Sequence, residues 1–258
     1  MSGSIRFDRA AEIYDRTRAI SREAMDRTTE LLASELGGRG RVLEIGVGTG
    51  LLALPLHRAG VPLVGLDLTE AMVAKLVEKA GGPSFPLVLG DATSMPFADD
   101  VFGGAYLRWV LHLIPDWRRV LAETVRVVRP GGVFVAELGH YDETRSEVQR
   151  RFAEIAGVSI EPVGLDWADY GSLDAEMAGH RATLRILPSV QETWEDALGD
   201  FLDGIEQGMY SWTWTVPEDV RLRTLAELRP WAVERFGPLD EVRRSPLLQV
   251  WRAYDLSG

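Results

Sequence analysis

Short apolar runs alternate with amphipathic segments through the first half of the chain. Runs rich in β-branched residues predict strands at 41–46, 62–67, 85–89, 101–107 and 132–138. Apolar residues at helical spacing predict helices between them, at 51–59, 70–79 and 116–128. Strands that are apolar throughout and alternate with helices are typical of a parallel sheet covered on both faces. Residues 38–140 are therefore predicted to form a doubly wound α/β core with right-handed crossovers.

The pattern is looser on either side of this core. Residues 8–36 have helical spacing that ends at Gly37-Gly38, which predicts one N-terminal helix. After residue 140 we expect helices at 143–156, 173–179, 193–207 and 217–236, and strands at 181–189 and 247–254. The predicted regions are an N-terminal helical segment (1–37), the core (38–140) and residues 141–258, which complete the sheet and add a helical cover. A fully separate second domain is the less favoured alternative.

Composition excludes several classes of function. The chain has 258 residues, of which 46% are hydrophobic, enough for one large domain or for a core with an elaboration. Its net charge of −11 disfavours a nucleic-acid substrate, because binding phosphates needs a basic surface. The absence of cysteine excludes disulfides and thiolate chemistry. The sequence contains no H-E-x-x-H motif, so a metal site is not supported. Without an apolar leader or a membrane-spanning run, the expected location is the cytoplasm.

A glycine-rich loop follows the first predicted strand of the core. It reads VLEIGVGTG at 42–50, so Gly46, Gly48 and Gly50 stand between a strand and a helix. Glycines there allow a tight turn and a close ligand, and a doubly wound sheet binds nucleotide-like ligands at this place. The G-x-G-x-G spacing departs from the G-x-G-x-x-G of dinucleotide sites. Glu44 lies close to the loop, and this carboxylate favours a ligand with ammonium and sulfonium groups over a pyrophosphate.

Two aspartates follow the next strands. Asp67 ends the second strand and can accept hydrogen bonds from both hydroxyls of a ribose. Asp91 follows the third strand, directly before Ala92, and can accept from an adenine amine. Taken singly, Asp67 could instead cap the helix that starts near Glu70, and Asp91 could be a turn residue. Their positions at the carboxyl ends of successive strands favour a shared cofactor site.

Residues 40–140 resemble the class I S-adenosylmethionine-dependent methyltransferases. Within that family they are most similar to the small-molecule branch of the ubiquinone/menaquinone-biosynthesis type. The matching segments are VLEIGVGTG at 42–50, VGLDLT at 64–69, GDATSMPFADDVF at 90–102 and LAETVRVVRPGGVFV at 121–135. The resemblance implies a Rossmann-like, mostly parallel seven-stranded sheet with helices on both faces. It also implies S-adenosyl-L-methionine as the cofactor and methyl transfer to a small molecule as the reaction.

The resemblance also assigns cofactor contacts by position. These residues are Tyr14, Glu44, Gly46, Gly48, Gly50, Asp67, Leu68, Met72, Asp91, Ala92 and Leu107. The three glycines would lie against the methionine part, Asp67 at the ribose and Asp91 at the adenine edge. The backbone carbonyl at Leu107 would approach the amino group. Tyr14 would reach the cofactor's carboxylate, although a place in the core is an equal alternative.

The acceptor side is less well marked, and here the chain departs from the family pattern. Phe102 is followed by Gly103 in place of the usual aspartate, and Arg108-Trp109 replaces a small or acidic pair, which suggests a different acceptor pocket. His112 and His140 follow the fourth and fifth strands and are candidate general bases, with packed histidines as the simpler interpretation.

Aromatic residues supply the remaining candidates for contact with the acceptor, namely Trp109, Tyr141 and Trp212. The alternating run 210–214 predicts a half-buried strand or part of the core of the helical cover, or else an apolar lid over the acceptor. Two other functions stay open: a non-catalytic regulatory protein that binds S-adenosylmethionine or S-adenosylhomocysteine, and an NAD-dependent oxidoreductase. The G-x-G-x-G spacing counts against the oxidoreductase. The sequence does not indicate an oligomeric state.

Overall fold

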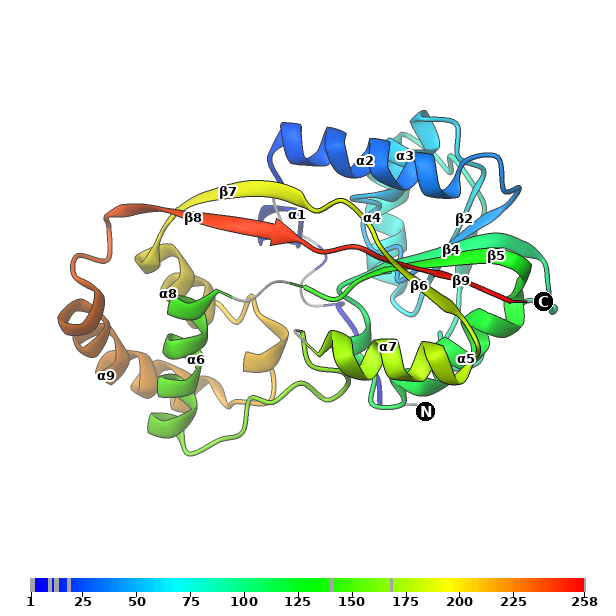
Figure 1. The fold of residues 1–258 in the computed structure, drawn as a ribbon. Coiled ribbons are helices and arrows are strands. Elements are labelled where there is room, and N and C mark those ends of the chain that lie inside the picture. Colours follow the sequence, from blue (N-terminus) through cyan, green and yellow to red (C-terminus); the bar gives the residue numbers. More distant parts are fainter. Residues whose placement is uncertain are drawn as a thin grey trace. The chain divides into compact units, whose positions relative to one another are not determined.

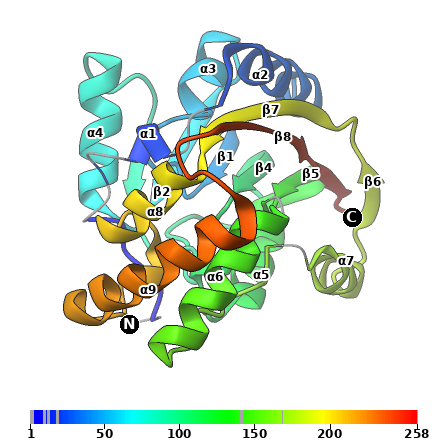
Figure 2. The same cartoon turned by 90° about the vertical axis from the view of Figure 1, so that its left-hand side faces the viewer.

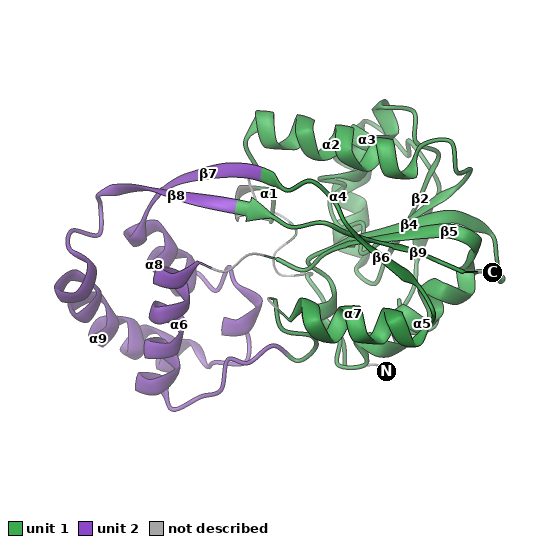
Figure 3. Cartoon of the chain, in the orientation of Figure 1, with its two compact units in different colours: residues 1–140, 163–190, 248–258 green, residues 141–162, 191–247 purple. Residues whose placement is uncertain are grey.

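The computed structural model describes residues 3–8, 11, 14–17, 20–139, 142–167 and 169–257. It divides the chain into two compact units (Figure 3). Unit 1 comprises residues 1–140, 163–190 and 248–258, and unit 2 comprises residues 141–162 and 191–247. The chain therefore passes between the units four times, and neither unit is one continuous segment.

Unit 1 is built on a seven-stranded sheet. Its strands are β1 (Val42–Ile45), β2 (Leu63–Asp67), β3 (Leu87–Leu89), β4 (Phe102–Arg108), β5 (Val128–Glu137), β6 (Thr183–Ile186) and β9 (Arg252–Asp255). They are arranged in the order β3-β2-β1-β4-β5-β9-β6. Strands β1 to β5 pair in parallel, whereas β9 is antiparallel to both β5 and β6. The predicted fold class, a mostly parallel seven-stranded α/β sheet, is confirmed.

Helices cover both faces of this sheet (Figures 1 and 2). The helices of unit 1 are α1 (Tyr14–Thr17), α2 (Arg22–Leu36), α3 (Ala53–Arg58), α4 (Glu70–Ala80), α5 (Trp117–Val127) and α7 (Tyr170–Gly179), with the 3₁₀ turn η1 (Leu111–Leu113). One apolar cluster joins the sheet to α2 and α3, and a second joins it to α5 and α7. Every residue of β1 is buried, which is why three of its four residues are apolar.

Unit 2 is chiefly helical. It contains α6 (Glu143–Ala156), α8 (Leu198–Glu206), the 3₁₀ turn η2 (Ser211–Thr213) and α9 (Glu218–Phe236). Its apolar core includes Phe152, Phe201 and Leu228. The strands β7 (Val190–Ala197) and β8 (Val242–Gln249) pair as a separate two-stranded sheet. No helix in the described ranges is long and apolar enough to cross a membrane.

Some predicted elements are wrong in their type or extent. Residues 193–197, predicted as the start of a helix, belong to β7, and the predicted strand 247–254 is two strands, the end of β8 and β9. The predicted N-terminal helix is divided, because Ser21 caps a new start at α2 by accepting a hydrogen bond from the backbone N–H of Ala24 at 3.2 Å. The run 210–214 includes the turn η2 and no strand.

Candidate functional site

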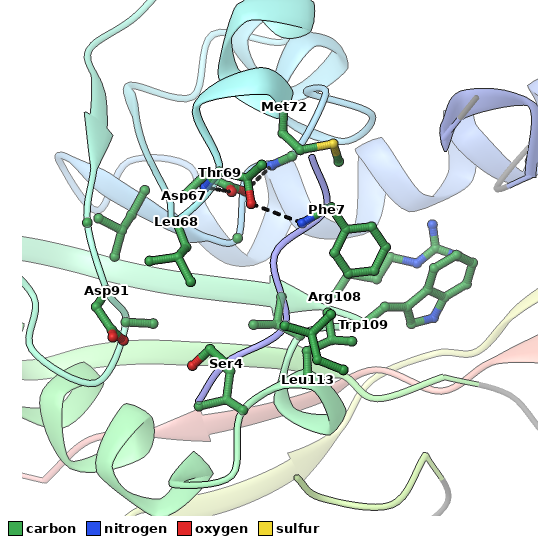
Figure 4. Close-up of a pocket in the computed structure, with 18 of the residues that line it drawn as sticks. Ser4, Phe7, Asp67, Leu68, Thr69, Met72, Asp91, Arg108, Trp109 and Leu113 are labelled. Atoms are coloured by element: carbon green, nitrogen blue, oxygen red, sulfur yellow. Dashed lines mark hydrogen bonds between the residues drawn. The ribbon is translucent and has the colours of Figure 1, made fainter. Parts of the chain in front are cut away.

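A pocket in unit 1 lies at the carboxyl ends of β1, β2, β3 and β4 (Figure 4). The described residues that line it are Ser4, Ile5, Phe7, Tyr14, Gly46, Gly48, Leu66, Asp67, Leu68, Thr69, Met72, Gly90, Asp91, Ala92, Arg108, Trp109, Val110, Leu113 and Ile114. Eight of the predicted cofactor residues are among them: Tyr14, Gly46, Gly48, Asp67, Leu68, Met72, Asp91 and Ala92. The structure thus brings together most of the cofactor site that the motifs predict.

The glycine loop has a backbone that side chains would disturb. Gly46 has a φ of +74°, and a Cβ atom there would lie 2.6 Å from a side-chain methyl of Val110. Gly50 also has a φ of +74°, and its Cβ would lie 2.8 Å from the side chain of Leu76. Gly50 does not line the pocket in the described chain; its small size lets α4 pack against the loop.

Asp67 joins the glycine loop to the end of β2. One carboxylate oxygen accepts a hydrogen bond from the backbone N–H of Gly48 at 2.8 Å, and the other accepts from the backbone N–H of Thr69 at 2.8 Å. Burial raises the pKa of Asp67, while the hydrogen bonds from Thr69 and Gly48 oppose that rise. The carboxylate is therefore held in one orientation at the pocket wall.

Glu44 lies behind the loop, outside the described lining of the pocket. Its carboxyl accepts a hydrogen bond from the hydroxyl of Tyr106 at 2.6 Å, and both residues are buried. Burial raises the pKa of Glu44 to about 8, against the lowering effect of the Tyr106 hydrogen bond and with a smaller contribution from the charge of Asp67. Glu44 is therefore largely protonated at neutral pH.

The loop that carries Asp91 is held by side chains to which the sequence motifs assigned no role. Asp91 accepts hydrogen bonds from the backbone N–H and hydroxyl of Thr93, at 2.9 and 2.8 Å. Further along, Glu123 of α5 accepts from the backbone N–H of Met95 at 2.8 Å, and Arg126 donates to Glu123 and to the carbonyl of Met95. Glu123 and Arg126 lie in the family-like segment 121–135, and their i,i+3 spacing on a helix is the sequence signal for this clamp, formed by Glu123, Arg126 and Met95.

The N-terminal segment forms one side of the pocket, and the sequence predicted only Tyr14 in this place. The backbone N–H of Phe7 donates to the hydroxyl of Thr69 at 3.3 Å, and the ring of Phe7 meets that of Tyr14 edge-on, with centroids 5.7 Å apart. Asp15 accepts hydrogen bonds from the Thr49 hydroxyl and, at 2.6 Å, from Lys79. These contacts tie the segment to the glycine loop and to α4.

A buried ion pair stands at the ends of β4 and β5. The Nε of Arg108 donates to Glu137 at 3.1 Å, and the guanidinium carbon of Arg108 lies 3.9 Å from the ring centroid of Trp109. Burial raises the pKa of Glu137, while the charge of Arg108 and hydrogen bonds from Arg108 and Trp109 lower it. Arg108 and Trp109 both line the pocket, and contact of Trp109 with the acceptor stays a prediction.

The other acceptor candidates lie elsewhere or are not described. The imidazole of His112 stacks on Trp167 with centroids 3.5 Å apart, and it does not line the pocket in the described chain. His140 and Tyr141 fall outside the described residues. Trp212 packs edge-on against Phe152, at 5.3 Å, in the core of unit 2. The roles of these residues remain predictions.

Two further expectations concern a backbone carbonyl and a metal. Leu107, whose carbonyl was expected near the cofactor's amino group, is fully buried and does not contribute to the described pocket lining. Within the described ranges no three histidine, aspartate or glutamate side chains are grouped so that they could hold a metal ion. The described site is therefore one of glycines, carboxylates and apolar side chains around a cleft.

Comparison with known proteins agrees with this geometry. Residues 43–136 match the family model of a methyltransferase domain. The chain is 35% identical over 138 residues to the demethylmenaquinone methyltransferase of Streptomyces avermitilis, an alignment that covers 52% of this chain and 59% of the relative. It is also 35% identical over 127 residues to the phosphatidylethanolamine N-methyltransferase of Cereibacter sphaeroides, covering 48% of this chain and 61% of the relative. The matched region thus spans less than two thirds of either relative.

Among solved structures, the fold resembles that of the YcgJ protein from Bacillus subtilis. The TM-score is 0.63 at 19% sequence identity, and the match covers 92% of this chain and 100% of the other. At this identity the likeness supports the fold alone and carries no information about the acceptor.

Proposed function

We propose that this chain, which belongs to the class I S-adenosylmethionine-dependent methyltransferases of the quinone-biosynthesis type, transfers a methyl group from S-adenosylmethionine to a small molecule. The observation that carries the proposal is the pocket in which Asp67, Asp91 and the glycine loop face one space. Such carboxylates at the ends of adjacent parallel strands suit the ribose and adenine of one nucleoside.

Each part of the cofactor has a suitable partner in this pocket. The ribose hydroxyls would bind Asp67, the adenine edge would meet Asp91 and Ala92, and the methionine part would follow the glycine loop. Leu68 and Met72 supply apolar surface for the adenine ring. The bound cofactor supplies a methyl group already activated by its sulfonium. The chain's own residues align the two reactants and exclude water, and the N-terminal segment 4–7 contributes to that exclusion.

The acceptor is proposed to be a small molecule with an apolar body. Trp109, Val110 and Leu113 supply apolar surface at one end of the pocket. The relatives named above act on demethylmenaquinone and on phosphatidylethanolamine, as their names state, so compounds of these two kinds are sensible first acceptors to try. The charge of −11 disfavours a nucleic acid as the acceptor. We propose a cytoplasmic location, which cell fractionation would check.

Binding and turnover together test the proposal. Calorimetry should show binding of S-adenosylhomocysteine in the micromolar range and no binding of NAD⁺. S-adenosylmethionine labelled on its methyl group should then transfer the label to one of a series of quinols, phenols and amines. Binding without transfer to any acceptor would favour the non-catalytic regulatory protein, and binding of NAD⁺ with no binding of S-adenosylhomocysteine would overturn the proposal.

A further inference from the structure

The charged side chains of the pocket are separated along its length. Asp67 and Asp91 lie toward one end, and Arg108 lies with Phe7 and Trp109 toward the other (Figure 4). Arg108 is the only cationic side chain among the described residues that line the pocket. If the nucleoside occupies the acidic end, as proposed above, the cationic end faces the reacting part of the cofactor and the acceptor.

Arg108 is held rigidly in this position. Its side chain is only 6% exposed and that of Glu137 only 1%. The hydrogen bond to Glu137 fixes one edge of the guanidinium, and the ring of Trp109 covers a face of it at 3.9 Å. Trp109 itself has a φ of +57°, a conformation that a bulky side chain rarely adopts and that tends to occur at functional sites.

One nitrogen of this guanidinium lacks a hydrogen-bond partner in the part of the chain that the structure describes. The Nη1 of Arg108 is buried and has no hydrogen-bond partner among the described residues. A buried donor of a charged group left unpaired costs free energy, and an ordered water, an ion or a ligand can complete it. A guanidinium matches the geometry and charge of a carboxylate better than any other side chain does.

We propose that Arg108 binds a carboxylate of a ligand in this pocket through its Nη1 group. The inference rests on the proposed function for the identity of that ligand. The carboxylate is either that of the methyl acceptor or that of the methionine part of the cofactor. Glu137 contacts the Nε of Arg108, which leaves the Nη1 group free of that interaction.

The first arm of the test asks about the cofactor's carboxylate. Calorimetry compares S-adenosylhomocysteine with 5′-methylthioadenosine, which lacks the amino-acid part, on the wild type and on Arg108→Met. If Arg108 binds the cofactor, the substitution weakens S-adenosylhomocysteine by about tenfold or more and leaves 5′-methylthioadenosine unchanged.

The second arm asks about the acceptor, using probes that differ in charge but hardly in shape. The pairs are 4-hydroxybenzoate with 4-hydroxybenzamide and 2-naphthoate with 2-naphthamide, titrated with and without S-adenosylhomocysteine. If Arg108 binds the acceptor, the wild type prefers the carboxylates by about tenfold or more and Arg108→Met loses that preference. This arm also runs without the cofactor, so it reports on Arg108 even if S-adenosylhomocysteine does not bind. Failure of S-adenosylhomocysteine to bind would count against the proposed function and not against the role of Arg108.

Two further variants separate binding from folding. Arg108→Met leaves Glu137 buried without its partner, so the double variant Arg108→Met/Glu137→Gln keeps the site neutral, and Arg108→Lys keeps the charge without the fork. The double variant should lose the carboxylate dependence, while Arg108→Lys should retain part of it. The proposal would be overturned if the folded double variant matched the wild type in two measurements. These are the affinity for S-adenosylhomocysteine and the ratio of the affinities for carboxylate and amide probes, even where that ratio is one in both proteins.

Discussion

The carboxylate of Asp67 accepts a hydrogen bond from the backbone N–H of Gly48 at 2.8 Å, across 19 positions of sequence. The end of β2 thereby fixes the conformation of the glycine loop that follows β1. Asp67 consequently has two tasks in the proposed enzyme, since the same carboxylate orders the loop and faces the place proposed for the ribose.

Substitution of Asp67 should therefore affect stability and binding together. Asp67→Ala removes both backbone hydrogen bonds and is expected to lower the free energy of unfolding by about 1–3 kcal/mol and the affinity for S-adenosylhomocysteine by about tenfold or more. Urea unfolding and calorimetry measure the two effects. Asp26→Ala, which removes an exposed carboxylate of α2 outside the pocket lining, is the control and should change neither. Full affinity in a folded Asp67→Ala variant would remove the ribose contact from the proposal.

A pair of glycine substitutions separates backbone strain from steric clash. Gly60 has a φ of +87°, and a Cβ added there would have no atom within 4 Å, so Gly60→Ala should cost roughly 1–2 kcal/mol from strain alone. Gly46→Ala adds the contact with Val110, and we expect roughly a further 1–3 kcal/mol together with weaker cofactor binding. Denaturant unfolding of both variants makes the comparison. Equal losses would mean that the loop moves away from Val110 without cost.

The pH dependence of stability should report the protonation of Glu44. Between pH 4.5 and about 8 the folded protein keeps a proton that the unfolded chain releases, so the free energy of unfolding contributed by this group falls as the pH rises through that window. The slope approaches about 1.4 kcal/mol per pH unit inside the window, and the contribution is constant above pH 8.

Glu44→Gln provides the matched comparison, because the amide cannot titrate. Urea unfolding from pH 5 to pH 9 should show a falling difference in stability between the wild type and this variant, with the steepest fall below the pKa of about 8. Tyr106→Phe removes the hydrogen bond that lowers the pKa of Glu44, and it should extend the fall to higher pH. A difference that does not vary with pH would show that Glu44 is ionised throughout.

The clamp on the Asp91 loop gives a prediction for residues outside the pocket. Glu123→Ala leaves the backbone N–H of Met95 without its acceptor and removes one of the two carboxylates that Arg126 binds, and it should cost about 1–3 kcal/mol and weaken nucleoside binding several-fold. Arg119→Ala removes an exposed guanidinium 3.7 Å from the same carboxylate and should cost less than about 1 kcal/mol. Thermal unfolding and calorimetry distinguish the two, and similar losses would contradict the assigned roles.

The parts of the fold that the sequence predicts well are those where burial dictates residue type. β1, β2 and β4 are mostly apolar because helices cover both faces of the sheet, and the glycine loop stands out because its backbone admits few side chains. By contrast, β7 reads VQETWEDA, in which polar residues alternate with a few apolar ones, and its neighbour α8 extends the same stretch. Local pattern could not separate the strand from the helix.

The site divides in the same way. Asp67 and Asp91 could be found because each follows an apolar strand directly, whereas Phe7 and Glu123 reach the site through contacts with residues far along the chain. The pairing of Arg108 with Glu137 depends on the register of β4 against β5, which no local pattern specifies. Long-range contacts of this kind account for most of what the sequence did not predict.

The position of β9 has a consequence for the folding of the chain during translation. β9 lies between β5 and β6, yet all of unit 2 is encoded before it. During translation β6 therefore emerges with no neighbour to pair with, and β5 keeps an open edge until residues 252–255 leave the exit tunnel. A product truncated before residue 252 would keep the edge of β5 unpaired, and an unpaired strand edge is prone to aggregation.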